Sequence, residues 1–335
     1  MSELPTPYGD VRDRTALVTG ATSGIGFAAA ASMAVAGARV LLGARDAERG
    51  QQAVEAIRQR APEARVEVLP CDVASLASVA EAAREASARV DHLDVLLNNA
   101  GVMATPRRET ADGFELQVGT NHLGHHALTA RLVDLLRAAP EPRVVTVSSS
   151  AHKMGQLTLA DLDDPRTLTH PERYSPWRAY GLSKLANLLF AFELDRRARA
   201  AGWPLRSLGA HPGYAATNLQ QRGPRMAGKR VQTALTGLAN ALVGQSPEDG
   251  AKPLLMAATD PDVPGGTYLG PGGVAEARGE PKVVAASALA HDRDLAARLW
   301  SVSSDLTGVG FGPLDEAVAQ AHHGEDGERN EDGEG

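Results

Sequence analysis

Tyr180 and Lys184 are the two side chains in this sequence whose types and spacing best suit proton transfer. Residues four positions apart lie one turn apart on the same face of a helix. A tyrosine titrates near pKa ~10, and a cation beside it in a water-poor cleft stabilises the phenolate. We therefore expect Lys184 to lower the pKa of Tyr180, so that the phenol can exchange a proton near neutral pH. The alternative is a solvated surface pair, because helices carry Tyr and Lys at this spacing by chance.

A glycine-rich turn follows the first apolar run and reads Thr19-Gly20-Ala21-Thr22-Ser23-Gly24-Ile25-Gly26. Glycine lets backbone N–H groups approach a pyrophosphate closely, and the helix that follows offers free donors at its positive end. The spacing G-x-x-x-G-x-G differs from G-x-G-x-x-G, and an ordinary strand-to-helix turn is the alternative. Because the turn lies in the first strand-to-helix junction, we interpret it as a dinucleotide site.

Short apolar runs alternate with Ala-rich amphipathic stretches along the first two thirds of the chain. Runs that are apolar throughout suit parallel strands covered on both faces. The pattern predicts an α/β fold: a three-layer, Rossmann-type, doubly wound parallel sheet in a single domain. We expect strands at 15–19, 39–42, 66–69, 95–97, 144–147 and 205–210, and helices at 23–36, 47–60, 76–89, 114–136 and 177–200.

The ends of the chain and two loops complete the expected organisation. We expect an N-terminal extension over 1–12 and a Rossmann-type domain over 13–315. Loops at about 151–176 and 214–247 should lie beside the substrate, since ligands bind beyond the carboxyl ends of parallel strands. Residues 324–335 are acidic and glycine-rich, which predicts a disordered tail.

Composition excludes several classes of protein. The 335 residues are 43% hydrophobic, enough for a large core, and the net charge of −7 argues against a nucleic-acid partner. No segment matches a signal peptide or a bilayer span, so we expect a cytoplasmic protein without a membrane partner. The single Cys71 excludes an internal disulfide, and its place after an apolar run indicates a buried structural thiol.

Seven motifs occur together and in order along most of the chain. They are TGATSGIG at 19–26, Asp72-Val73, NNAG at 98–101, Asn121 in NHLGHH, Ser149 in VTVSSSAH, Tyr180 with Lys184, and HPGYAAT at 211–217. With these motifs the sequence resembles the short-chain dehydrogenase/reductase family.

The resemblance implies a catalytic group. Tyr180 would be the general acid in carbonyl reduction and the base in alcohol oxidation, and Lys184 would lower its pKa and bind the nicotinamide ribose. Ser149, the middle of three serines, would polarise the substrate oxygen. Its neighbours Ser148 and Ser150 would be loop or capping hydroxyls. Asn121 would hold a proton-relay water, although an Asn in a helix can also bend the helix through local bonds.

The resemblance also implies a set of cofactor contacts. Asp72 and Asn98 would lie on the adenosine side, and Thr217 would meet the nicotinamide amide. The implied contacts are Gly20, Thr22, Ser23, Gly24, Ile25, Gly26, Arg45, Asp72, Val73, Asn98, Ala100, Gly101, Tyr180, Lys184, Pro212, Gly213 and Thr217.

The end of the second strand bears on the choice of cofactor. Family members that use NAD typically carry an acid there, whereas this chain has Ala44 followed by Arg45. A guanidinium can form bidentate bonds to a 2′-phosphate. We therefore predict NADP(H) as the preferred cofactor, with NAD(H) possible. The alternative is that Arg45 pairs with Asp46 or Glu48.

A long insert between Ser149 and Tyr180, the segment SKLANLLF and the segment GGTYLGPGG at 265–273 indicate a branch of the family. They resemble the retinol-dehydrogenase-like and WW-domain-oxidoreductase-like branch. Apolar pocket candidates predict a largely apolar substrate, with Arg222 and Arg225 able to close over an acidic tail. These candidates are Met154, Leu157, Trp177, Tyr214, Leu219 and Met226.

The predicted function is an NADP(H)-dependent oxidoreductase that moves hydride between nicotinamide and a carbonyl or alcohol carbon, with reduction favoured and no metal. His122, His125 and His126 lack a third ligand at suitable spacing and a carboxylate partner, so we expect them to be packed. One alternative is an NADP(H)-binding regulator with little or no turnover. Another is an assembly protein that uses the 177–200 helix as a subunit interface, and a homodimer or homotetramer is possible.

Overall fold

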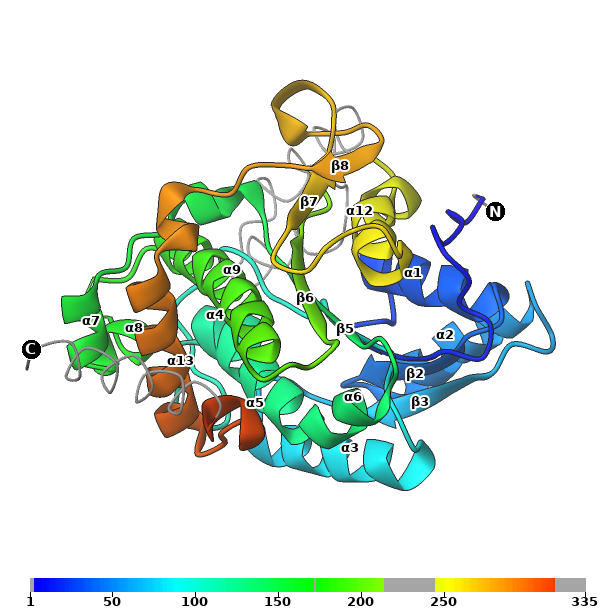
Figure 1. Cartoon of the computed structure of the whole chain (residues 1–335), viewed down its shortest axis with the longest axis horizontal. Helices are drawn as coiled ribbons and strands as arrows, with labels where there is room; N and C mark the ends of the chain where they lie inside the picture. The colour runs from blue at the N-terminus through cyan, green and yellow to red at the C-terminus, as the bar shows by residue number, and fades with distance from the viewer. Residues whose placement is uncertain (1–2, 172, 214–244, 317–335) are drawn as a thin grey trace, which may run out of the picture.

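The computed structural model describes residues 3–171, 173–213 and 245–316, which form one eight-stranded sheet between layers of helices (Figure 1). The strand order is β3-β2-β1-β4-β5-β6-β7-β8. Neighbouring strands are parallel except β7 and β8, which pair antiparallel at one edge. The strands are β1 (Thr15–Thr19), β2 (Arg39–Ala44), β3 (Val66–Pro70), β4 (Val95–Asn98), β5 (Arg143–Val147), β6 (Arg206–Ala210), β7 (Tyr268–Pro271) and β8 (Pro281–Val283).

Helices cover both faces of the sheet. On one face lie α1 (Gly24–Val35), α2 (Ala47–Arg58) and α12 (Pro247–Thr259), and on the other α3 (Leu76–Arg89), α5 (Gly124–Arg131), α6 (Val133–Ala138) and α9 (Pro176–Ala200). The helix α13 (Arg293–Thr307) packs along α9 (Figure 1). Shorter helices are α4 (Leu116–Val118), α7 (Leu159–Asp163) and α8 (Arg166–Thr169).

Alternation along the strands builds a separate core on each face of the sheet. In β1, Ala16 and Val18 join the core under α1 and α12, whereas Leu17 joins the core under α3 and α5. Successive strand side chains point to opposite faces, so a strand that is apolar throughout must be covered twice. The predicted three-layer, doubly wound fold is therefore confirmed.

The predicted helix at 114–136 is interrupted. The chain forms α4, a π-helical turn over Gly119–Leu123, and then α5 and α6. The side chain of Asn121 lies in the π-helical turn and bonds outside its own helix, to Val102 and Ser183. Single π-helical turns inside α-helices are frequently found at functional sites.

The polar stretch predicted as a loop at 151–176 contains a 3₁₀ turn over Ser150–Met154 and the helices α7 and α8. A capping box starts α7, because Thr158 accepts from the backbone N–H of Asp161 and the Asp161 carboxylate accepts in return. Helices of four or five residues are too short to show a 3.6-residue repeat, which explains why the pattern did not predict them.

The described N-terminal residues lie against α12. Val11 is buried in the core, and the backbone N–H of Tyr8 donates to Thr259 Oγ1 at 2.9 Å. Over the residues that the structure describes, none of the helices combines the length and the apolar character needed to span a bilayer. The predicted tail at 324–335 and most of the predicted loop at 214–247 lie outside the described residues.

Candidate active site

The polar side chains singled out in the sequence follow the carboxyl ends of neighbouring strands. The glycine turn follows β1, Arg45 follows β2, Asp72 follows β3 and Ser149 follows β5. Parallel strands end at the same edge of a sheet, and a crevice forms where the strand order reverses. Here the order reverses between β1 and β4. These side chains therefore share one edge of the molecule.

Tyr180 and Lys184 lie in the first half of α9, which begins with Pro176 at its first helical position. Their side chains are buried, and Lys184 Nζ is 5.8 Å from the centre of the Tyr180 ring. Lys184 Nζ also donates to the carbonyl of Val147 at 2.9 Å, which ties α9 to the end of β5. A buried pair of this kind overturns the surface-pair alternative.

Burial moves both ionisable groups toward their neutral forms. It raises the pKa of Tyr180 to about 12, partly offset by a hydrogen bond with the Ser149 hydroxyl, and lowers the pKa of Lys184 to about 7. In the cofactor-free protein burial therefore outweighs the lowering of the Tyr180 pKa that was expected from Lys184. At neutral pH Tyr180 holds its proton, which is the state that a general acid needs.

The three serines after β5 have three different places. Ser149 caps the 3₁₀ turn, accepting from the backbone N–H of Ala151 at 3.2 Å, and its hydroxyl lies near enough to Tyr180 to lower the pKa of the phenol. Ser148 lies in the loop after β5, as expected, and its buried hydroxyl donates to the Lys184 carbonyl at 2.7 Å. Ser150 is exposed. The middle serine is thus the one beside the tyrosine.

Asn121 lies close to the site, but its side chain is fully engaged elsewhere. Its Oδ1 accepts from the Val102 N–H at 2.8 Å, and its Nδ2 donates to the Val102 carbonyl and the Ser183 hydroxyl, both at 2.9 Å. The Asn121 carbonyl lies 3.0 Å from His125 Nδ1. The side chain therefore connects the segment after β4 to α9 and does not bond Lys184.

The turn after β1 has the features of an anion site. Gly20 and Gly24 adopt φ of 65° and 63°, which favours glycine. Ser23 makes no side-chain cap bond, and the first turn of α1 contains no acid. The first N–H groups of α1 and its positive end are thus left for an anion. The residues present fit a dinucleotide pyrophosphate.

Arg45 is exposed directly after β2. Asp46, a predicted alternative partner, instead caps α2 by accepting from the Arg49 N–H at 3.1 Å, and lies 3.9 Å from the Arg49 guanidinium. Within the described residues Arg45 makes no hydrogen bond or ion pair. Its guanidinium can therefore meet an anionic group on a ligand.

Comparisons with known proteins agree with this geometry. The family model described as short chain dehydrogenase matches residues 14–160. Mouse polyprenol dehydrogenase is 43% identical over 308 residues, which cover 90% of this chain and 86% of that protein. Mouse retinol dehydrogenase 14 is 36% identical over 313 residues, covering 90% and 88%. The chain belongs to the short-chain dehydrogenase/reductase family.

This short-chain dehydrogenase/reductase lies in the retinol-dehydrogenase-like branch, and it is an oxidoreductase that acts on CH–OH groups with a nicotinamide cofactor. The crystal structure of an uncharacterised protein from Mycobacterium paratuberculosis is 40% identical, with a TM-score of 0.71 over 92% of this chain and 97% of that one. L-Sorbose reductase from Gluconobacter frateurii, solved with NADPH and L-sorbose, shares the fold: 20% identity, TM-score 0.61, covering 78% and 96%.

Two of the predicted cofactor residues can face a ligand only through their backbone. The Asn98 side chain is buried and donates to Thr129 Oγ1 at 3.0 Å, so its predicted contact on the adenosine side would be made by the backbone. The Val73 side chain is buried in the core. Asp72 is half-buried at the end of β3, where its carboxylate accepts from the Ala74 N–H at 3.0 Å.

Asn99 is a residue that the sequence reasoning missed. Its Nδ2 donates to the Thr19 carbonyl at 2.7 Å, and the N–H groups of Asn99 and Ala100 both donate to Thr19 Oγ1 at 2.9 Å. This contact clamps the glycine turn to the end of β4. A Cβ added to Gly26 would lie 2.2 Å from Asn99 Nδ2, so the turn and the clamp fit closely. The second Asn of NNAG was the available signal.

The buried His211, in the segment after β6, has a half-buried partner on the β7–β8 hairpin. His211 Nδ1 accepts from the Gly213 N–H at 3.2 Å, which leaves the proton on Nε2, 3.2 Å from Glu276 Oε2. Gly213 has φ 69° and lies against the Ala277 carbonyl. Glu276 lies more than sixty positions after His211, so sequence spacing gave no signal for the pair. Pro212 and Gly213 are half-buried at this edge, and Thr217 lies outside the described residues.

The three neighbouring histidines are packed, as expected. His122 Nε2 lies 2.8 Å from Ser303 Oγ, and His125 Nε2 lies 2.9 Å from Thr19 Oγ1. His126 sits among Phe190, Trp300 and Phe311. In the described part of the chain, no group of three or more His, Cys, Asp or Glu is arranged to hold a metal.

The predicted pocket residues separate into three groups. Trp177 and Met154 are exposed, and the Trp177 ring lies edge-on to Tyr180 with 6.1 Å between ring centres. Leu157 is instead buried in the core beside α9, so the prediction that it lines the pocket is wrong. The remaining candidates, Tyr214, Leu219, Met226, Arg222 and Arg225, lie outside the described residues.

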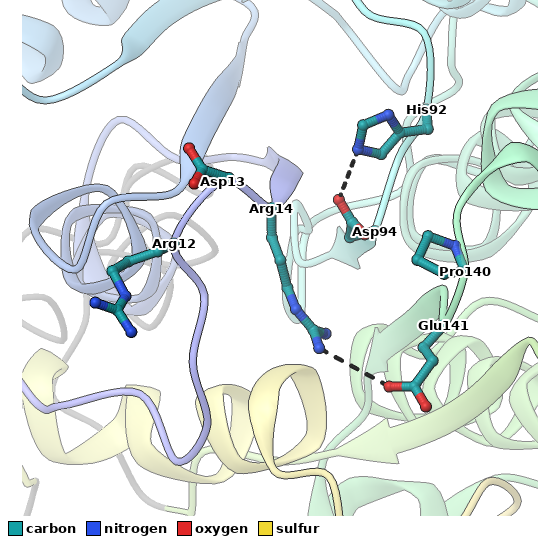
Figure 2. A pocket seen from close by; sticks show the side chains of 7 residues that line it. All are labelled: Arg12, Asp13, Arg14, His92, Asp94, Pro140 and Glu141. Carbon is teal, nitrogen blue, oxygen red and sulfur yellow. Dashed lines mark ion pairs between the residues drawn. The ribbon is translucent and has the colours of Figure 1, made fainter.

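A hollow of about 590 Å³ lies at the opposite edge of the sheet, where the strands begin (Figure 2). Arg14 precedes β1 and reaches toward Glu141, and His92 reaches toward Asp94, which precedes β4. The Asp94 carboxylate accepts from the Thr15 N–H at 2.7 Å. The charges around the hollow are therefore engaged in structural contacts, far from the strand ends that carry the candidate site.

Proposed function

We propose that the protein is an NADP(H)-dependent oxidoreductase that interconverts a carbonyl and an alcohol on a largely apolar small molecule, with Tyr180 as the general acid and base. The observation that carries the proposal is the buried cluster at the start of α9. There a buried, protonated Tyr180 lies beside Lys184, 5.8 Å from Nζ to the ring centre, and near the Ser149 hydroxyl. A purely structural cluster would have no need of an ionisable phenol and amine together in the interior.

Each residue of the cluster has a distinct part in the proposed reaction. When bound, the nicotinamide supplies or accepts the hydride. In the reducing direction Tyr180 donates its phenolic proton to the substrate oxygen, while the Ser149 hydroxyl stabilises the charge that develops there. Lys184 uses one donor on the Val147 carbonyl and keeps others for a ribose hydroxyl and for the phenolate left on Tyr180. In the oxidising direction the proton moves the other way.

The free guanidinium of Arg45 supports the preference for NADP(H). A 2′-phosphate beside Arg45 would gain charge-assisted hydrogen bonds, and Ala44 presents no carboxylate that would repel it. Arg45→Asp tests this proposal directly, because the new carboxylate would repel a phosphate and accept from ribose hydroxyls. We expect the ratio of kcat/KM for NADPH over NADH to fall by about a hundredfold or more. An unchanged ratio would show that Arg45 does not determine the choice between NADPH and NADH.

A long apolar substrate agrees with the exposed rim of the site and with the relatives. Trp177 and Met154 are 53% and 49% exposed near Tyr180, which leaves apolar surface available to a substrate. The relatives at 43% and 36% identity are named for polyprenol and retinol, which are isoprenoid alcohols. We therefore propose an isoprenoid or similar long-chain aldehyde and alcohol pair.

A substrate panel tests the proposed reaction. Oxidation of NADPH and of NADH would be followed with hexanal, farnesal, retinal, an aryl ketone and a quinone, and the reverse reaction with the matching alcohols. We expect NADPH to support turnover best and long apolar aldehydes to have the highest kcat/KM. Tight NADPH binding without turnover of any panel member would contradict the proposal and favour the regulatory alternative. A preference for small, charged substrates would contradict the apolar site.

A further inference from the structure

The side chain of Gln117, in α4, links three segments that meet beside the catalytic helix. Its Nε2 donates to the Pro176 carbonyl and to the Tyr174 hydroxyl, both at 2.9 Å, and its Oε1 accepts from the Ala104 N–H at 2.7 Å. Both amide protons and the amide oxygen thus have partners, and the side chain is fully buried. A buried polar group with all of its bonds made holds its neighbours in one arrangement.

Asn121 repeats the same connection one turn further along. Its amide bonds both backbone groups of Val102 and the Ser183 hydroxyl on α9. Gln117 and Asn121 are four residues apart, and their partners on α9, Pro176 and Ser183, are seven apart. Both spacings keep residues on one helix face. Two buried amides therefore hold the segment after β4 against α9 at two levels.

The segment that Gln117 holds is strained and borders the site. Ala104 adopts φ 47°, a left-handed conformation that is unfavourable for a residue with a Cβ. Strain of this kind persists only where surrounding contacts fix it, and the bond from the Ala104 N–H to Gln117 is such a contact. The residue directly before Val102 borders the site, because a Cβ added to Gly101 would be 3.9 Å from Lys184 Nζ.

Tyr174 closes the arrangement from the side of the insert. Its hydroxyl donates to the Thr105 carbonyl at 2.8 Å, accepts from Gln117 Nε2, and lies 3.1 Å from Glu115 Oε1. The other oxygen of Glu115 accepts from the N–H groups of Gln117 and Val118, which fixes the start of α4. The Gln117 carboxamide thereby connects the end of the insert, the strained segment and the first residue of α9.

We propose that Gln117 is a positioning residue that sets the shape of the substrate side of the site, by fixing 102–105 against the start of α9. The inference rests on the proposed function, since it assigns a role in substrate choice. In the described structure the Gln117 side chain makes hydrogen bonds to Ala104, Tyr174 and Pro176, and none to Tyr180, Lys184 or the turn after β1. Its loss should therefore alter substrate discrimination and leave cofactor binding unchanged.

The test uses Gln117→Met, which keeps the length of the side chain and removes its hydrogen bonds, and Tyr174→Phe, which removes only the hydroxyl. The matched control is Gln59→Met, the same change on an exposed residue at the end of α2. We expect the ratio of kcat/KM for farnesal over hexanal to fall about tenfold in Gln117→Met and by less in Tyr174→Phe. The Kd for NADPH should stay within about twofold of wild type. The control should match wild type in both respects.

Hydrogen–deuterium exchange gives a readout that does not depend on turnover. In Gln117→Met the amides of 102–105 and of 177–180 should exchange faster together, while those of the turn at 19–26 stay unchanged. If no member of the substrate panel were turned over but this exchange pattern were seen, the proposed reaction would be rejected. The coupling of 102–105 to the start of α9 through Gln117 would still stand.

Three results would overturn the inference. One is an unchanged substrate ratio in both variants of an active enzyme. A second is a uniform loss across substrates that follows thermal stability, which would make Gln117 merely structural. A third is faster exchange confined to 102–105, which would show that α9 is not coupled through Gln117.

Discussion

At the scale of single residues, Tyr180 and Lys184 show how burial affects the proposed catalytic pair. Each is removed from water by the packing of α9 against β5, and each is shifted toward its neutral form. A neutral phenol can donate a proton, and a lysine with a pKa of about 7 is partly charged near neutral pH. The protonated phenol agrees with the proposed role of Tyr180 as the general acid in carbonyl reduction.

The lowered pKa of Lys184 predicts how stability depends on pH. Its pKa falls from 10.5 to about 7 on folding, so between these values the unfolded state binds a proton that the folded state does not. Stability contributed through this group therefore rises as pH increases across that window and is constant below it. In Lys184→Met this part of the rise should disappear. Urea unfolding of the cofactor-free protein at about pH 7.5 and about pH 10 measures the difference.

Lys153→Met is the matched control, because Lys153 is exposed on the nearby 3₁₀ turn. It should keep the full pH dependence of wild type. An equal rise in the free energy of unfolding with pH in Lys184→Met and in wild type would show that Lys184 keeps its charge when buried. That result would contradict the lowered pKa of Lys184.

At the scale of elements, the sequence was most informative where an element is long and strongly patterned. The strand at 15–19 and the helix at 76–89 have the predicted bounds, because apolar runs and amphipathic repeats span each of them completely. The glycine turn and Tyr180 with Lys184 were predicted because their chemistry depends on local spacing. Glu276 and Gln117 were missed because their partners lie far away in the sequence, where periodicity carries no information.

The turn of the β7–β8 hairpin allows a prediction that separates backbone strain from a side-chain contact. Ala275 and Glu276 both adopt left-handed backbone, with φ 53° and 55°. Asn tolerates this conformation better than either residue. Ala275 is exposed, so Ala275→Asn should raise the free energy of unfolding by a few tenths of a kcal/mol.

Glu276→Asn should instead lower the free energy of unfolding by about 1 kcal/mol, despite the same backbone relief. Asn is too short to reach the buried Nε2 of His211, which is 3.2 Å from Glu276 Oε2 in a contact bent away from ideal hydrogen-bond geometry. Denaturant unfolding of both variants measures the two effects. Equal stabilisation by both substitutions would show that Glu276 contributes nothing to His211.

At the scale of the whole molecule, the carboxyl ends and the amino ends of the strands differ in function. The carboxyl ends of the strands carry the candidate site, and the amino ends carry charges engaged in structural contacts around the hollow (Figure 2). Parallel sheets commonly divide in this way, because ligand-binding loops follow the strands at one edge only. The cytoplasmic location and the oligomeric state stay predictions.

This division predicts that Asp94→Ala affects stability and leaves kinetics unchanged. Removing the buried carboxylate leaves the Thr15 N–H without its acceptor and should cost about 1–3 kcal/mol. The kcat and KM of the folded enzyme should match wild type, since the change lies at the opposite edge from Tyr180. Glu141→Ala across the same hollow should cost less than about 1 kcal/mol, because its partner Arg14 is 3.9 Å away and Glu141 is exposed. A large loss of kcat in Asp94→Ala would contradict the division between the edges.

The most direct test of the central claim compares wild type with Tyr180→Phe in NADPH-dependent reduction of the best aldehyde, alongside NADPH binding by calorimetry. The account predicts that kcat falls by about a thousandfold or more, because the proton donor is gone, while the Kd for NADPH and the thermal stability change little. Turnover of Tyr180→Phe within about tenfold of wild type would contradict the account, because the proton would then come from another group.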